Sequence, residues 1–223
     1  MLTILFEDNY LIATNKPAGL RAEGHPGMQF GVSEYLRKTY PWKKQLITGV
    51  VHRLDRSVSG VMLFAKTPMA LKALNLQFEK RSVRKYYVAI LDKKPPEVQG
   101  ELRHWLIKDI KAREALMVTP KNRKAKECLL RYHAVAAVND LHLVKIELLT
   151  GRYHQIRAQM SAIGCPILGD DKYGGSATEG QHTIYLHSSE LVVRHPKTHH
   201  LLRLEAPLPA RGHWTLFGDA KTA

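Results

Sequence analysis

The residues best suited to chemistry are an aspartate and the arginines that flank it, in the segment His52-Arg53-Leu54-Asp55-Arg56. A guanidinium is always charged near neutral pH, and an opposite charge within about 4–6 Å lowers the pKa of a carboxylic acid by roughly 1–3 units. Asp55 is therefore predicted to stay ionised even when partly buried. An ionised carboxylate of this kind can act as a nucleophile or as a base. The alternative interpretation is a solvated cluster of ion pairs on a loop.

The elements that must position this aspartate are short strands and a few amphipathic helices. Strands are predicted at 3–6, 10–13, 61–65, 86–91, 142–149, 184–186, 190–193 and 201–204. Helices are predicted at 33–38, 68–80 and 153–163. The second is the best marked, because Thr67 can cap it and Pro68 suits its first position. Strands and helices do not follow a regular βαβ order, so the predicted fold class is α+β.

Five segments resemble, in the same order, those of RluA-type RNA pseudouridine synthases. They are Asn15-Lys-Pro-Ala-Gly-Leu20, His52 to Gly60, Lys85-Tyr-Tyr-Val-Ala89, Thr150-Gly-Arg-Tyr-His-Gln-Ile-Arg157 and the closing segment that ends at Pro209. This resemblance covers almost the whole chain. It implies one catalytic domain, residues 1–223, built on a mixed, mainly antiparallel β-sheet. It also implies a minimal member without the S4-like RNA-binding domain that many members carry before the catalytic one.

The resemblance assigns roles to individual residues. It implies that Asp55 is the catalytic residue, that Tyr87 lines the site beside it, and that Arg157 pairs with it and keeps it ionised. The ring of Tyr87 could stack on a uracil, whereas Tyr86, its strand neighbour, faces the opposite side. Arg53 resembles the family's arginine that enters the RNA stack when the target base leaves it, at a cost of a few kcal/mol. A plain phosphate contact is the alternative role for Arg53.

The charge balance indicates a polyanionic partner. The chain has 34 Lys+Arg against 20 Asp+Glu, hence a formal net charge of +14, and its pI is near 9.8. Nucleic acid is the leading candidate. The predicted RNA contacts are Arg53, Arg56, Arg152, His154, Lys121, Arg123 and Lys124, with the basic segment Trp42-Lys-Lys44 as a further candidate. Charged loops can equally be only solvated, so the basic segments keep both interpretations open.

The composition also guides expectations about cofactors and location. The sequence has no glycine-rich phosphate loop, dinucleotide motif or metal-ligand spacing, so neither a cofactor nor a metal is expected. Its two cysteines lie far apart in the chain, which is typical of a reducing compartment. Acids near the N-terminus argue against a signal peptide, and no run is long enough to span a membrane. A cytoplasmic monomer without an obligate protein partner is expected.

Together these features predict an enzyme that isomerises specific uridines of ribosomal or transfer RNA to pseudouridine. The main alternative is a non-catalytic RNA-binding protein that retains the fold. A hydrolase acting on RNA is a third possibility, but it needs a second positioned carboxylate or a histidine as acid partner. The mass of the RNA distinguishes isomerisation from hydrolysis. The residues do not decide whether Asp55 attacks the sugar, attacks the ring or removes a proton.

Overall fold

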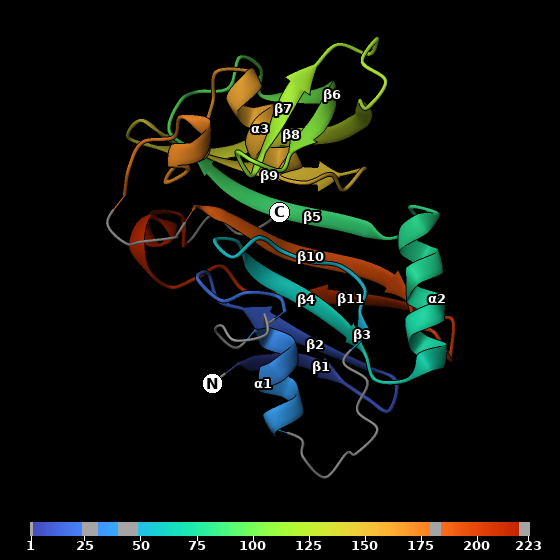
Figure 1. Ribbon diagram of the computed structural model, residues 1–223. Coiled ribbons are helices and arrows are strands. Elements are labelled where there is room, and N and C mark those ends of the chain that lie inside the picture. The colour runs from blue at the N-terminus through green and yellow to red at the C-terminus, as the bar shows by residue number, and fades with distance from the viewer. Residues whose placement is uncertain (1, 24–30, 40–48, 179–183, 219–223) are drawn as a thin grey trace. The chain divides into compact units, whose positions relative to one another are not determined.

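A computed structural model describes residues 2–23, 31–39, 49–178 and 184–218 (Figure 1). The chain divides into two compact units. Unit 1 comprises Met1–Lys85 and Ser188–Pro207, and unit 2 comprises Tyr86–His187 and Leu208–Ala223. The expectation of a single catalytic domain stays a prediction. The basic segment at 42–44 lies outside the described residues.

Unit 1 is built on a sheet with the strand order β1-β2-β4-β10, in which β3 also pairs with β4 and β11 with β10 (Figure 1). Its strands are β1 (Thr3–Glu7), β2 (Leu11–Lys16), β3 (Gly49–Val50), β4 (Ser59–Ala65), β10 (Leu186–Arg194) and β11 (Leu201–Glu205). Its helices are α1 (Val32–Thr39) and α2 (Pro68–Glu79). The pairs β1–β2, β2–β4, β3–β4 and β10–β11 are antiparallel.

The core of unit 1 forms around β4, in which all seven residues are buried. Side chains such as Val61 and Leu63 pack with Ala70 and Leu74 of α2. Helix α2 begins where the sequence predicts, because the Thr67 side chain accepts a hydrogen bond from the Ala70 N–H at 3.2 Å and a proline opens the helix. This core provides the rigid support for the loop that carries Asp55.

Unit 2 has the strand order β5-β9-β8-β6-β7, and these four neighbouring pairs are antiparallel (Figure 1). The strands are β5 (Arg84–Leu91), β6 (Gln99–Asp109), β7 (Glu114–Val118), β8 (Lys126–Val138) and β9 (Leu141–Leu148). Helix α3 (Gln155–Ala162) packs on β6 and β7, and two 3₁₀ helices follow, η1 (Asp171–Tyr173) and η2 (Gly212–Phe217). The α+β class is confirmed.

Four strands, the two-residue β3 and the longer β6, β7 and β8, were not among the predicted elements. Along much of β6 and β8, exposed positions alternate with buried or half-buried ones, and several carry charged side chains, as in Arg103 and Arg131. These arginines lie within 4 Å of glutamates on neighbouring strands, so charge is neutralised across the sheet surface. A charged strand surface resembles a loop in sequence, and the pattern alone did not reveal these strands. The runs predicted at 184–186 and 190–193 contribute to one strand, β10, which begins at Leu186.

Among the described residues, no helix has the length and apolar character needed to cross a membrane.

Candidate active site

Asp55 lies half-buried on the loop between β3 and β4, in a turn in which the Val58 N–H donates to the Asp55 carbonyl at 3.1 Å. His52 attaches the start of this loop to β4. Its Nε2 accepts a hydrogen bond from the Leu63 N–H at 3.0 Å, and its ring stacks on Phe78 at 5.2 Å. Burial, assisted by the positive charge of Lys85, lowers the pKa of His52 to about 4. The ring is therefore neutral, as an acceptor at Nε2 must be.

Lys16, at the end of β2, ties the same loop to the turn that follows β2. Its side chain is fully buried, and Nζ donates to the carbonyls of Pro17 at 3.0 Å, Leu20 at 2.7 Å and Arg56 at 3.3 Å. The Gly19 N–H donates to the Arg56 carbonyl at 2.7 Å, and Arg56 Nε donates to the Gly19 carbonyl at 2.9 Å. Arg56, a predicted RNA contact, thus uses its Nε in an internal bond.

The charge of Lys16 is coupled to that of Asp55. Burial lowers the pKa of Lys16 to about 7, while the negative charge of Asp55 opposes this shift. Lys16 was not among the predicted site residues, although it lies in the first of the five segments that resemble the family. The available signal was a lysine at the end of a strand that begins with the apolar run Leu11-Ile12-Ala13. This lysine adds a third positive group near an aspartate that already has two arginines beside it in sequence.

Two further features of the loop are a glycine at its end and an arginine whose side chain is exposed to solvent. Gly60 has φ +114°, and a Cβ there would lie 2.1 Å from the Ser188 carbonyl oxygen, so only glycine allows β4 to approach β10 here. The side chain of Arg53 is 74% exposed and lies 3.7 Å from Glu23. Its guanidinium is thus placed in solvent, where an RNA strand could reach it.

In unit 2, a chain of buried amides fixes the start of α3. The Thr150 hydroxyl donates to Gln155 Oε1 at 2.8 Å, and the Arg152 N–H donates to the same oxygen at 2.9 Å. Gln155 Nε2 donates to Gln159 Oε1 at 2.9 Å, and Gln159 Nε2 donates to the Leu102 carbonyl at 2.9 Å. These bonds join the helix to its preceding turn and to the sheet, and the bond between Gln155 and Gln159 links the two along the helix. The residues at the helix start therefore have little freedom to move.

Arg157, on α3, forms a buried two-pronged ion pair with Asp170. Arg157 Nε and Nη2 lie 2.7 Å from Asp170 Oδ2 and Oδ1, respectively. The guanidinium also lies over the ring of Tyr173, 4.9 Å from its centroid. Such paired bonds fix the plane of a guanidinium as well as its position. Asp170 was not among the predicted site residues, and its pairing joins residues 13 positions apart.

His154 precedes α3 in a left-handed conformation, with φ 50°, and stacks on Tyr153 at 3.8 Å. Its Nδ1 lies 3.0 Å from the Tyr173 hydroxyl, which accepts a hydrogen bond from the Ala115 N–H at 2.7 Å. Burial raises the pKa of Tyr173 to about 12, so the phenol keeps its proton at neutral pH.

Comparison with known proteins identifies the group to which the chain belongs. Residues 10–162, more than half of the chain, match the sequence profile of the RNA pseudouridylate synthase family. The chain belongs to this family. The resemblance found in the five sequence segments is thus confirmed.

Relatives of this pseudouridylate synthase family member are named for ribosomal RNA modification. Ribosomal large subunit pseudouridine synthase C of Yersinia pestis is 36% identical over 211 residues, covering 92% of this chain and 65% of that protein. Its counterpart from Escherichia coli K12 is 34% identical over 213 residues, covering 92% of this chain and 66% of that protein. The chain thus spans about 65% of the length of the curated relatives that it matches.

Solved structures confirm the fold of this family member. Human RNA Pseudouridylate Synthase Domain Containing 1 aligns with a TM-score of 0.78 at 22% identity, covering 100% of this chain and 96% of that chain. Human RNA Pseudouridylate Synthase Domain Containing 4 aligns with a TM-score of 0.76 at 24% identity, covering 93% and 88%.

The other predicted site residues of this family member lie in unit 2. Tyr87 is buried in β5 opposite Ile146. Arg152 is half-buried, and its Nε donates to the Glu127 carbonyl at 3.1 Å. The turn between β7 and β8 carries the three exposed side chains of Lys121, Arg123 and Lys124. Unit 1 thus groups Arg53, Asp55 and Arg56 on one loop, and unit 2 groups Arg152, His154 and Arg157 at the start of α3.

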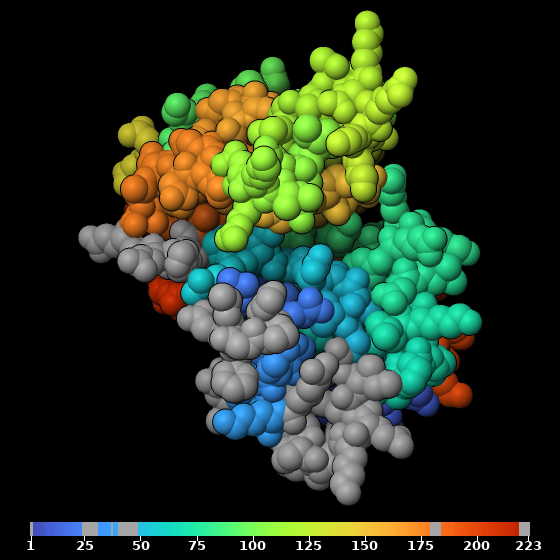
Figure 2. Space-filling view, in the orientation of Figure 1, coloured from blue at the N-terminus to red at the C-terminus, as the bar shows by residue number. Residues whose placement is uncertain are grey.

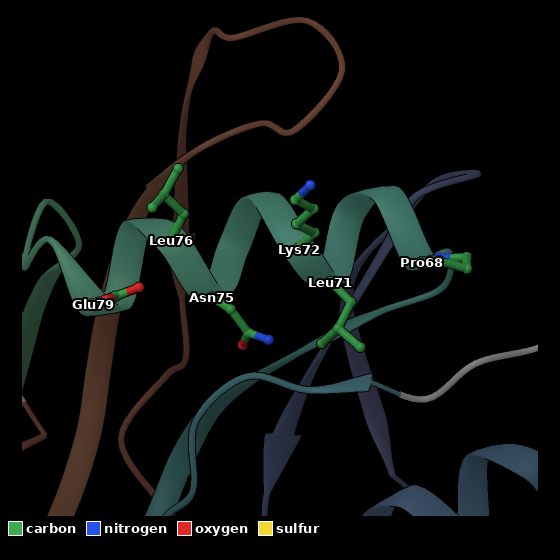
Figure 3. Close-up of a pocket in the computed structure, with 6 residues that line it drawn as sticks. All are labelled: Pro68, Leu71, Lys72, Asn75, Leu76 and Glu79. Carbon is green, nitrogen blue, oxygen red and sulfur yellow. The ribbon is translucent and has the colours of Figure 1, made fainter.

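A separate hollow of about 500 Å³ lies along α2 (Figure 3). It is lined by Pro68, Leu71, Lys72, Asn75, Leu76 and Glu79. None of the predicted site residues lines it, and it offers no nucleophile beside a base, so it is not the candidate active site of this pseudouridylate synthase family member. Among the residues that the structure describes, no three histidine, cysteine or acidic side chains are grouped as metal ligands.

Proposed function

We propose that this protein is an RNA pseudouridine synthase with Asp55 as its catalytic residue. The observation that carries the proposal is the arrangement of the Asp55 loop, which His52 and Lys16 fix to the core of unit 1 in a chain that belongs to the family. The relatives named above are ribosomal large subunit pseudouridine synthases, so large-subunit ribosomal RNA is the proposed substrate. Transfer RNA is the second RNA to test.

The proposed reaction rearranges one nucleotide without oxidation or reduction. The bond between N1 of uracil and C1′ of ribose breaks, a bond forms between C5 and C1′, C5 loses a proton and N1 gains one. Asp55 attacks the sugar or the ring, or removes a proton from the sugar. Arg157, oriented by Asp170, keeps Asp55 ionised, and Tyr87 stacks on the target uracil. Arg53 fills the gap that the extruded base leaves in the RNA stack.

The test compares wild-type protein with Asp55→Asn on unmodified transcripts of ribosomal and transfer RNA. Carbodiimide labelling and primer extension reveal pseudouridine as new stops. Stops are expected with wild type and are expected to disappear in Asp55→Asn. The exposed Asp140, on the turn between β8 and β9, provides the matched control, because Asp140→Asn makes the same change away from the site.

Each other outcome selects a different conclusion. Stops that persist in Asp55→Asn would refute the role of Asp55 and leave the activity standing. Tight, salt-sensitive RNA binding without stops on either RNA would favour the non-catalytic RNA-binding protein. A change in the mass of the RNA would indicate a hydrolase.

We also propose a cytoplasmic monomer. Cys128 and Cys165 are both buried and free, which agrees with a reducing compartment. Light scattering after size-exclusion chromatography measures the molar mass, and a value of twice the chain mass or more would refute the monomer.

A further inference from the structure

An isoleucine stands almost fully in solvent at the turn between β6 and β7. Ile110 is 79% exposed, the highest value among the large apolar side chains that are exposed in the described part of the chain. Lys108, Lys111 and Arg113 surround it in sequence, and Lys111 and Arg113 are exposed as well. A single exposed isoleucine is common on protein surfaces. Ile110 differs in lying between exposed cations at the tip of a hairpin, and this combination of apolar and positive groups suits contact with a nucleic acid.

The turn is fixed from within. Asp109 Oδ1 accepts hydrogen bonds from the backbone N–H groups of Lys111 at 2.8 Å and Ala112 at 3.0 Å. Arg113 adopts the left-handed region with φ 55°, an uncommon conformation for arginine. A carboxylate used in this way makes a local turn instead of pairing with the lysines beside it. The backbone that presents Ile110 is therefore ordered without help from a partner.

The turn is also attached to the part of unit 2 that carries candidate site residues. The Tyr153 hydroxyl donates to the Arg113 carbonyl at 3.2 Å, and Lys172 Nζ donates to the Ala112 carbonyl at 3.1 Å. Tyr153 stacks on His154, and Lys108 Nζ lies 4.5 Å from the centroid of the Tyr153 ring. The tip of the hairpin and the start of α3 thus form one connected surface.

At the tip of this surface, two positive charges have no carboxylate partner in the part of the chain that the structure describes. On the sheet, Arg103 pairs with Glu127 at 2.7 Å and Arg131 with Glu101 at 3.1 Å. In contrast, Lys111 and Arg113 have no carboxylate within 4 Å among the described residues. The segment around β7, light green in Figure 2, lies at the surface of unit 2. An unneutralised cationic surface is suited to an anionic partner.

We propose that the β6–β7 turn is an RNA-contacting element, in which Ile110 packs against or between bases and Lys111 and Arg113 contact phosphates. The inference rests on the proposed function in taking RNA as the polyanion. RNA offers negative charge together with exposed apolar base faces, and apolar wedges between bases are a known mode of nucleic-acid binding. The ordered backbone reduces the entropy lost on binding. The connection to α3 places this contact beside the nucleotides that reach the site residues of unit 2.

The experiment measures binding and modification of an unmodified large-subunit ribosomal RNA transcript by Ile110→Ser and Lys111→Ala. Two other exposed residues of unit 2 provide matched controls: Val98→Ser, at a valine that is 64% exposed, and Lys94→Ala, at an exposed lysine. Both turn variants should weaken binding about fivefold, with an increase in KM larger than the change in kcat. Lys111→Ala should also reduce the slope of log K against log salt by about one, whereas Ile110→Ser should leave the slope unchanged.

Binding and KM equal to wild type in both turn variants would overturn the inference, as would equal losses in the two controls. Thermal unfolding of all four variants identifies any loss caused by misfolding, and the exposed positions should leave it unchanged. The proposed function has its own readout. Wild-type protein that forms no pseudouridine refutes that function, while the binding comparison still decides whether the turn contacts RNA.

Discussion

At the scale of the single residue, the cost of burying a charge determines the pKa of Lys16. Its ammonium group loses water but gains three backbone carbonyls and the nearby charge of Asp55. The gain does not fully replace hydration, because the pKa remains near 7 instead of 10.5. Lys16 therefore holds the Asp55 loop at a cost in stability that depends on pH.

This cost can be measured with Lys16→Met. Between about pH 7 and 10.5 the unfolded wild-type chain binds more protons at this position than the folded chain, so its stability rises with pH. The free energy of unfolding of wild type, minus that of Lys16→Met, should increase from about pH 7 to about pH 9. Urea unfolding at a series of pH values gives both curves. Parallel curves would show that Lys16 does not titrate in this range.

The buried pair of Arg157 and Asp170 leads to a second prediction at this scale. Asp170→Asn removes the carboxylate that forms two bonds with the buried guanidinium of Arg157, and it should cost about 3 kcal/mol of unfolding free energy. Glu127→Gln makes the same change in the exposed pair with Arg103 and should cost less than about 1 kcal/mol. Chemical denaturation compares the two. Similar small losses would mean that the buried pair contributes no more than a surface pair.

At the scale of the element, the close approach of β4 and β10 fixes the end of the Asp55 loop. Gly60→Ala combines a positive φ with a Cβ 2.1 Å from the Ser188 carbonyl oxygen. Gly19→Ala has a similar φ, +90°, but open space around the new methyl group. We expect Gly60→Ala to lower the thermal midpoint clearly more than Gly19→Ala, because backbone at a strand pair cannot move aside cheaply. Equal midpoints would mean that the positive φ alone, and not the close approach to Ser188, causes the loss of stability.

Elements could be predicted from sequence where their signals are local. Thr67 and Pro68 are adjacent, and they located the start of α2 correctly. The strands β6 to β8 depend on partners across the sheet, which a sequence pattern does not display. The site divides in the same way. Asp55 could be predicted because the arginines on either side of it are close in sequence. Lys16, in contrast, binds the carbonyl of Arg56, 40 residues away, and this contact exists only in the folded chain.

At the scale of the whole molecule, the arrangement of charge is more informative than its sum. A net charge of +14 indicates affinity for polyanions, yet part of the positive charge is neutralised by glutamates on the sheet of unit 2. Lys121, Arg123 and Lys124, exposed on the turn between β7 and β8, have no carboxylate within 4 Å among the described residues. Affinity for RNA should therefore depend on where a charge lies.

Two variants with similar changes in charge test this expectation. Replacing Lys121, Arg123 and Lys124 together by alanine should reduce the slope of log K against log salt by about 0.7–0.9 for each phosphate that the protein no longer neutralises. Replacing Arg103 and Arg131 by alanine also removes positive charge, but it releases Glu127 and Glu101 and leaves every predicted RNA-binding side chain in place. Its slope should stay close to wild type, although the added negative field lowers overall affinity somewhat. Filter binding of an RNA transcript across a range of salt concentrations measures both slopes. If the two slopes fall in proportion to the charges removed, RNA binding depends only on the net charge of the protein. The β7–β8 turn is then not a specific contact.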